Sequence, residues 1–204
     1  MKTTITGLYD SYNDAKAAVK ALENAGVSSD DISIVTNKAN GDVDVEGQGN
    51  KAGEGAGTGA GVGAIAGGAG GLLTGLGMLA IPGVGPVVAA GWLAATAAGA
   101  VAGAVAGGAV GGIVGAMVES GVPENDAHFY AESIRRGGSV VTARVEEDRR
   151  ASAEAILNSS PRVDIAARRA RYTEQGWTRF DEAADPYTPE QIAAERDRYR
   201  VNRL

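Results

Sequence analysis

The sequence predicts an α+β fold: a small ferredoxin-like plait interrupted by a long glycine-zipper helical hairpin and followed by a helical C-terminal tail. Three observations support this prediction. Residues 1–36 have a strand–helix–strand pattern, residues 119–160 have a helix–strand–helix pattern, and the stretch 55–118 between them contains no Asp, Glu, Lys, Arg or His. A polar linker, 37–54, leads into that stretch, and residues 161–204 form the tail.

The first half of the predicted plait is a βαβ unit. Residues 3–9 are rich in β-branched and aromatic side chains, which is typical of a strand, and residues 32–36 form a second apolar, β-branched run. Asp10 or Ser11 can cap a helix over 12–25, whose apolar face is formed by Ala15, Ala18, Val19 and Leu22. Because βαβ crossovers are nearly always right-handed, we expect the two strands to be parallel.

The second half and the tail consist of helices around one further strand. Pro123 suits the first position of a short helix, and the strand that follows spans 139–145. Helices are predicted over 148–158 and, with an amphipathic pattern, over 163–175, and a capping box at Thr188 starts the last one. We expect the strands to form one small sheet with the helices on one face.

The charge-free stretch holds 21 of the 31 glycines, and two runs within it place a glycine at every fourth position. A turn at 82–86 separates the runs, which indicates two helices. Each glycine weakens a helix by roughly 1 kcal/mol, and close contact between two glycine-faced helices can offset that cost. The predicted packing residues are Gly55, Gly59, Gly63, Gly67, Gly71, Gly75, Gly99, Gly103, Gly107, Gly111 and Gly115.

Two environments fit such a hairpin. Helices over 57–81 and 86–118 would each exceed the about 20 residues that cross a bilayer, so we expect the hairpin to span a membrane with both flanks cytoplasmic. However, Gly and Ala gain little from lipid, and the flanks are acidic. The alternative is a soluble cytoplasmic assembly, a closed homo-oligomer or a filament, in which hairpins of several copies pack together.

Composition argues against most other functions. The net charge of −6 is unsuited to nucleic acid, which requires a dense basic surface. The chain has no Cys and one histidine, His128, whose neighbours do not form a convergent set of metal ligands. The glycines complete no phosphate-binding motif. We therefore expect no catalytic residue, cofactor or metal, no identified small-molecule ligand, and a non-enzymatic role.

A basic cluster in the tail is a candidate contact site. Arginines within the amphipathic helix and just before it lie close in sequence to aromatic residues, a pattern typical of helices that meet anionic lipid or a protein partner. The alternative is a helix whose arginines pair with the acidic residues around it. The cluster consists of Arg162, Arg168, Arg169, Arg171 and Trp177.

Several segments resemble bacterial general stress proteins of the heat-induced or low-temperature-induced type. They are the opening TITGLYDSYNDAKAAVKALENAGVSSDDISIVTN and the residues 121–130, 135–142, 163–165 and 175–178. The resemblance implies a stress-induced, membrane-associated bacterial protein and supplies no catalytic residues. The first hypothesis is thus a membrane-associated stress protein that self-associates through its hairpin. The alternatives are the soluble assembly and, by fold analogy alone, a plait that senses a small molecule.

Overall fold

The computed structural model describes residues 1–39, 77–97 and 112–201. The predictions for the linker residues 40–54 and for most of the zipper glycines, from Gly55 to Gly75 and from Gly99 to Gly111, lie outside these ranges. Gly115 is the zipper glycine that lies inside them.

The described residues form an α+β fold around one five-stranded sheet in which all neighbouring strands are antiparallel. The order is β1-β5-β2-β4-β3. Since β1 and β2 both run antiparallel to β5, they are parallel to each other, as predicted, with β5 between them. The strands are β1 (Lys2–Tyr9), β2 (Ile32–Asn37), β3 (Gly77–Ile81), β4 (Gly85–Gly91) and β5 (Ser139–Glu146).

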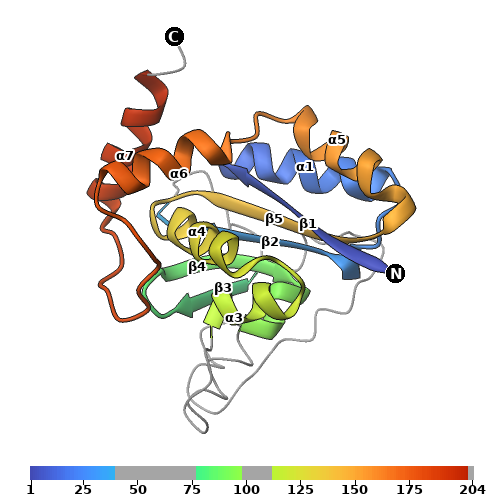
Figure 1. Cartoon of the computed structure of the whole chain (residues 1–204), viewed down its shortest axis with the longest axis horizontal. Helices are drawn as coiled ribbons and strands as arrows, with labels where there is room; N and C mark the ends of the chain where they lie inside the picture. Colours follow the sequence, from blue (N-terminus) through green and yellow to red (C-terminus); the bar gives the residue numbers. More distant parts are fainter. Residues whose placement is uncertain (40–76, 98–111, 202–204) are drawn as a thin grey trace, which may run out of the picture.

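Helices α1 (Tyr12–Asn24) and α5 (Arg150–Ser159) cover one face of the sheet (Figure 1). The Ser11 side chain accepts a hydrogen bond from the Asp14 N–H and so caps α1. The buried face of α1 is the predicted one, and it packs with Ile32 and Ile34 of β2 and with Leu157 of α5. Short 3₁₀ turns, Ser29–Asp31 and Glu147–Arg149, precede β2 and α5.

The opposite face of the sheet is also covered, which corrects the expectation that helices lie on one face only. Here α4 (Glu124–Arg135) packs on β2 and β5, and α3 (Gly112–Glu119) packs on α4. Side chains alternate along each strand, so Val35 of β2 and Val140 of β5 face this second core, while their neighbours Ile34 and Val141 face α1. A sheet that is apolar on both faces needs helices on both faces.

The prediction of a helical hairpin is wrong for residues 77–91, the central part of that stretch that the structure describes. Residues 77–91 form a β-hairpin, β3 and β4, and β4 pairs antiparallel with β2 from Asn37↔Val87 to Ser33↔Gly91. The predicted turn is present, but it joins strands: Gly83 and Gly85 have φ of +71° and +92°. Pairing with β2 satisfies the backbone groups of β4 and buries Val87 and Val88. A short apolar run can form either a helix or a strand, and here hydrogen bonding to the free edge of β2 stabilises the strand.

The second predicted helix, 86–118, is also interrupted. Residues 92–97 are helical, but α3 starts at Gly112 with φ of +79°, outside the helical region, so the two cannot belong to one continuous helix. Leu93 and Ile113 are both buried in the core on the α4 side. Within the described ranges, no helix has both the length and the apolar character required to cross a bilayer.

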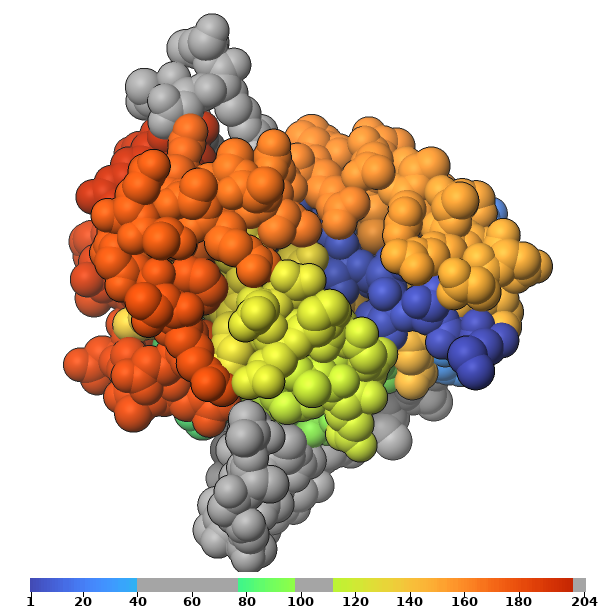
Figure 2. All heavy atoms as spheres, viewed as in Figure 1, coloured from blue at the N-terminus to red at the C-terminus, as the bar shows by residue number. Residues whose placement is uncertain are grey.

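The tail returns along the outer edge of β1 and then packs on α4. The Val163 N–H donates to the Leu8 carbonyl at 2.8 Å, just before α6 (Ile165–Glu174). The last helix, α7 (Pro189–Val201), starts at the predicted capping box, where Gln191 and Thr188 exchange hydrogen bonds. Figure 2 shows the C-terminal residues, in orange and red, lying along the side of α4.

Candidate functional site

A buried network of arginines and carboxylates joins α4, α6 and α7. Its centre is Arg136, at the end of α4, which is 8% exposed. The Arg136 guanidinium donates to Glu132 Oε1 at 2.6 Å, to Glu195 Oε1 of α7 at 3.1 Å, and to Gln175 Oε1. Removing one partner of a buried ion pair costs about 3–5 kcal/mol because the other charge stays buried. This network is therefore a strong candidate for holding the tail in place.

A second arginine continues the network toward the start of the chain. Arg168 of α6 is also 8% exposed, donates to Asp10 Oδ1 at 2.8 Å, and stacks on the Tyr199 ring with 3.5 Å between the guanidinium carbon and the ring centroid. The Tyr199 hydroxyl in turn donates to Glu195 Oε2 at 2.9 Å. Burial and the neighbouring Glu195 carboxylate raise the pKa of Tyr199 well above its ordinary value. Tyr199 thus stays protonated and serves as a hydrogen-bond donor.

Aromatic side chains fill the space beside this network. Arg136 lies 4.1 Å over the Tyr172 ring, and Tyr172 is fully buried. The centroid of the Phe129 ring in α4 lies 5.6 Å from the centroid of the Tyr172 ring, in a tilted arrangement. It lies 6.4 Å from the centroid of the Trp177 ring, in an edge-to-face arrangement. Such pairs are favourable beyond the area that they bury. The cluster fixes α6 against α4.

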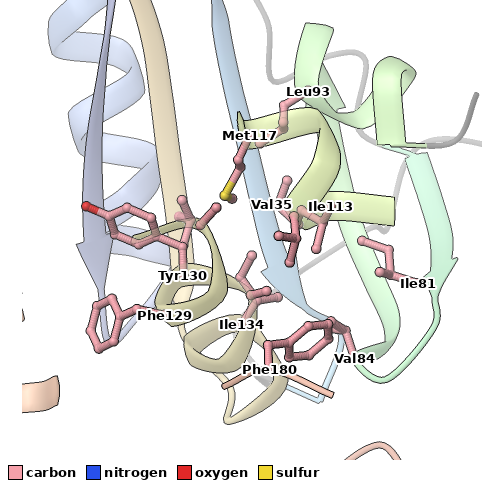
Figure 3. Packing of buried hydrophobic residues seen from close by; sticks show 14 of the residues in the cluster. Val35, Ile81, Val84, Leu93, Ile113, Met117, Phe129, Tyr130, Ile134 and Phe180 are labelled. Carbon is pink, nitrogen blue, oxygen red and sulfur yellow. The ribbon is translucent and has the colours of Figure 1, made fainter. Parts of the chain in front are cut away.

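The connection between α6 and α7 reaches across to the β3–β4 turn. Phe180 is buried, and Figure 3 shows its ring close to Val84 in that turn. A Cβ atom added to Gly83 would lie 2.6 Å from the Asp181 carbonyl oxygen, so the two backbones approach closely. Arg135 also donates to the Asp185 carbonyl at 2.8 Å. The tail is therefore part of the fold and contacts the element that replaces the predicted helical hairpin.

His128 of α4 lies at the rim of this region. Its exposed fraction is 7%, and neither ring nitrogen has a hydrogen-bond partner within the described structure. The closest carboxylate oxygen, Glu124 Oε1, is 3.6 Å from Nε2 and is shared with Arg179 at 3.0 Å. Burial, followed by the Arg179 charge, lowers the pKa of His128, and Glu124 opposes this only in part. The imidazole is therefore neutral at pH 7.

The structure places the five predicted contact residues in different roles. Arg168 belongs to the buried network, and Arg169 pairs with Asp126 at 2.5 Å. Arg162 donates to the Thr6 carbonyl at 2.6 Å, and Arg171 lies 6.0 Å from the centre of the Tyr199 ring. Trp177 is half-buried in the aromatic cluster. They do not converge on one exposed face.

Gly115, the described member of the predicted packing stripe, lies in α3 and is half-buried. No group of three or more His, Cys, Asp and Glu side chains that could hold a metal ion occurs in the described part of the chain.

Sequence reasoning missed the network because its key partners are distant: Arg136 and Glu195 are 59 residues apart, and Arg168 and Asp10 are 158 apart. A partial signal existed within single helices. Glu132 and Arg136 have the i,i+4 spacing of a helical ion pair, and Glu195 and Tyr199 have the same spacing.

The fold defines an α+β protein whose antiparallel sheet is covered on both faces. Within that broad class, residues 4–82 match the family model of the heat induced stress protein YflT domain, from β1 to the turn after β3. The resemblance to bacterial general stress proteins is thereby confirmed for this part of the chain and points to a role in the stress response. No curated protein and no solved structure matches the chain.

Proposed function

We propose that this chain is a non-enzymatic stress-response protein that self-associates through two glycine-rich segments, residues 55–76 and 98–111. One observation carries the proposal: both segments are free of Asp, Glu, Lys, Arg and His, and the elements on either side of each belong to one folded domain. Soluble monomers rarely expose apolar surface on this scale, so segments of this length and composition need another surface to pack against. Glycine stripes suit close packing against an identical copy.

The connections of the fold favour this proposal over a pair of membrane spans. Strands β2 and β3 belong to one sheet, so the chain between them must return to the side from which it left. Two crossings need about 40 apolar residues, and only the 22 residues 55–76 of that connection are charge-free. The other segment, 98–111, has 14 residues, and Ala97 just before it and Ile113 shortly after it are both buried in the same core. Neither length is sufficient to cross a bilayer and return.

Association with the bacterial inner membrane is the second candidate, and we place it at the membrane surface rather than across it. The charge-free segment 55–76 supports it, since uncharged apolar residues can enter the interface. Contact with anionic lipid or a partner through Arg162, Arg169, Arg171 and Trp177 remains part of this proposal. Arg168 is the least available of the predicted residues, because its guanidinium is buried against Asp10 and Tyr199.

We regard β1, α1, β2, α4 and β5 as the plait-like core of this protein, with the β3–β4 hairpin added beside β2. A small-molecule ligand of that core would have to be found by direct binding measurements.

The proposed self-association is tested by changing the glycine stripe. Gly67→Leu combined with Gly107→Leu adds bulk on the packing face, and we expect the assembly to shift toward monomer in light scattering without detergent. The matched control is Ala69→Leu with Ala109→Leu, which adds the same side chain two residues further along and should keep the assembly. A monomeric wild-type protein, or equal assembly of both variants, would contradict the proposal.

A further inference from the structure

Strand β3 forms one edge of the sheet in the described structure. It is the last strand in the order β1-β5-β2-β4-β3, and among the described strands it pairs with β4 alone. In an antiparallel sheet, alternate residues of an edge strand point their N–H and C=O groups away from the neighbouring strand. Such a row of backbone groups is a template for pairing with another extended segment.

The opposite edge of the sheet, β1, is protected by the tail. The Val163 N–H donates to the Leu8 carbonyl at 2.8 Å. Arg162 forms an antiparallel bridge with Tyr9 at the end of the strand. Lys2 places a charge at the start of β1, and charged side chains discourage pairing at a strand edge. A further strand therefore has little access to this side of the sheet.

Strand β3 lacks these protective features. Its sequence, GMLAI, contains no charge and no proline. Met78 is 55% exposed, Ala80 is exposed, and a Cβ atom added to Gly77 would have no atom within 4 Å. Leu79 points to the other face of the strand and is half-buried against the core on the α4 side. The edge is thus apolar, uncharged and open at its first residues.

A second copy of this chain fits the β3 edge. Two β3 strands that pair antiparallel about a two-fold axis at Leu79 give all five residues a partner. Leu79 then lies opposite Leu79 of the second copy, and the large Met78 lies opposite the small Ala80, on the same face of the joined sheet. No like charges meet there, although the chain carries a net charge of −6. Since the tail protects β1, the pairing joins β3 to β3 and closes at two copies.

We propose that the β3 edge is a dimer interface, at which two copies of this chain pair through β3 and join their five-stranded sheets into one. The interface consists of described residues, so it is separate from the glycine-rich segments and does not depend on the self-association proposed for them. A strand of five residues buries less area than a standard protein interface. The dimer is therefore weak, and its population rises with protein concentration.

Disulfide trapping tests the register of the two strands, because the chain has no cysteine of its own. Met78→Cys and Ala80→Cys change exposed positions that face each other between the copies of the proposed dimer. When the two variants are mixed and mildly oxidised, we expect at least about tenfold more disulfide-linked heterodimer than when either is mixed with Val118→Cys, since only closely apposed thiols form a bridge. Val118 is the matched control, an exposed apolar residue on α3.

A charge at the edge provides a second measurement. Met78→Lys brings two like charges close together across the paired strands and should raise the dissociation constant of the dimer by about tenfold or more in analytical ultracentrifugation. Val118→Lys introduces the same charge on α3 and should leave the constant unchanged. Both variants also carry Gly67→Leu and Gly107→Leu, so that association through the glycine-rich segments is weakened in each.

The outcomes separate this interface from the proposed function. Heterodimer no more abundant than in the Val118→Cys mixtures overturns the β3 dimer, and so does equal association of Met78→Lys and Val118→Lys. A homodimer of Met78→Cys as abundant as the heterodimer overturns the two-fold register at Leu79. If the heterodimer forms while the glycine and alanine variants of the proposed function assemble equally, the glycine-rich interface fails and the β3 dimer stands.

Discussion

The burial and the protonation state of His128 depend on the tertiary structure around it. In the sequence it stands between Glu124 and Glu132, one turn away on each side, and looks like a solvated helix residue. In the structure it is almost fully buried, and neither nitrogen has a hydrogen-bond partner in the described part of the chain. Burial of an unpaired imidazole favours its neutral form.

The buried imidazole predicts a loss of stability in acid. The pKa of His128 is lowered by folding, so between its ordinary value of about 6.5 and the lower folded value the unfolded chain binds more protons. The free energy of unfolding therefore falls as pH drops through this range and is fully retained above it. Urea unfolding of wild type and His128→Leu between about pH 7 and pH 5 should show a smaller pH slope in the variant. Parallel curves would contradict the prediction.

Other single residues behave as their local sequence indicates. Gly26 has φ of +82° at the end of α1, in the left-handed region that glycine adopts readily after a helix. Ser11 caps α1, and Thr188 and Gln191 form the capping box of α7. These features depend on atoms within a few residues of one another, so they can be predicted without the fold.

At the scale of elements, the β3–β4 hairpin is held on the sheet by β2. Gly91 ends β4 with φ of +90°, and an added Cβ would overlap the Ile32 carbonyl oxygen. Gly77, at the start of β3, has no atom within 4 Å of an added Cβ and no positive φ. The two glycines at the ends of the hairpin therefore differ sharply in their tolerance of a side chain.

That difference predicts opposite outcomes for two matched substitutions. Gly91→Ala should lower the free energy of unfolding by about 3 kcal/mol, since it combines a clash with backbone strain at positive φ. Gly77→Ala should change it by less than about 0.5 kcal/mol. Chemical denaturation of both variants measures the difference. Equal stability would mean that β4 does not approach β2 as closely as described.

The whole molecule places β1, β5, β2, β4 and β3 in one sheet between two helical layers. The described residues on both sides of each glycine-rich segment belong to this single body. A membrane-spanning hairpin of the predicted kind would need residues 77–91 within the bilayer, yet those residues pair with β2.

This architecture predicts how the protein behaves toward membranes. Under the proposed surface association, the chain should be released from isolated membranes by an alkaline carbonate wash, because a surface-bound protein has no segment in the hydrocarbon core. Centrifugation after the wash, followed by detection of the chain in supernatant and pellet, provides the measurement. Retention in the pellet until detergent is added would show that a segment spans the bilayer after all.

Local sequence by itself determined most of the helices, the strands β1, β2 and β5, the parallel direction of β1 and β2, and the caps. These depend on periodicity and on side chains within one or two turns. Tertiary structure alone decided that residues 77–91 are strands, that both faces of the sheet are covered, and that Arg136 binds Glu195. The reason is physical: an apolar run adopts the conformation for which a partner supplies hydrogen bonds and buried area, and here the partner is β2, more than 40 residues earlier in the chain.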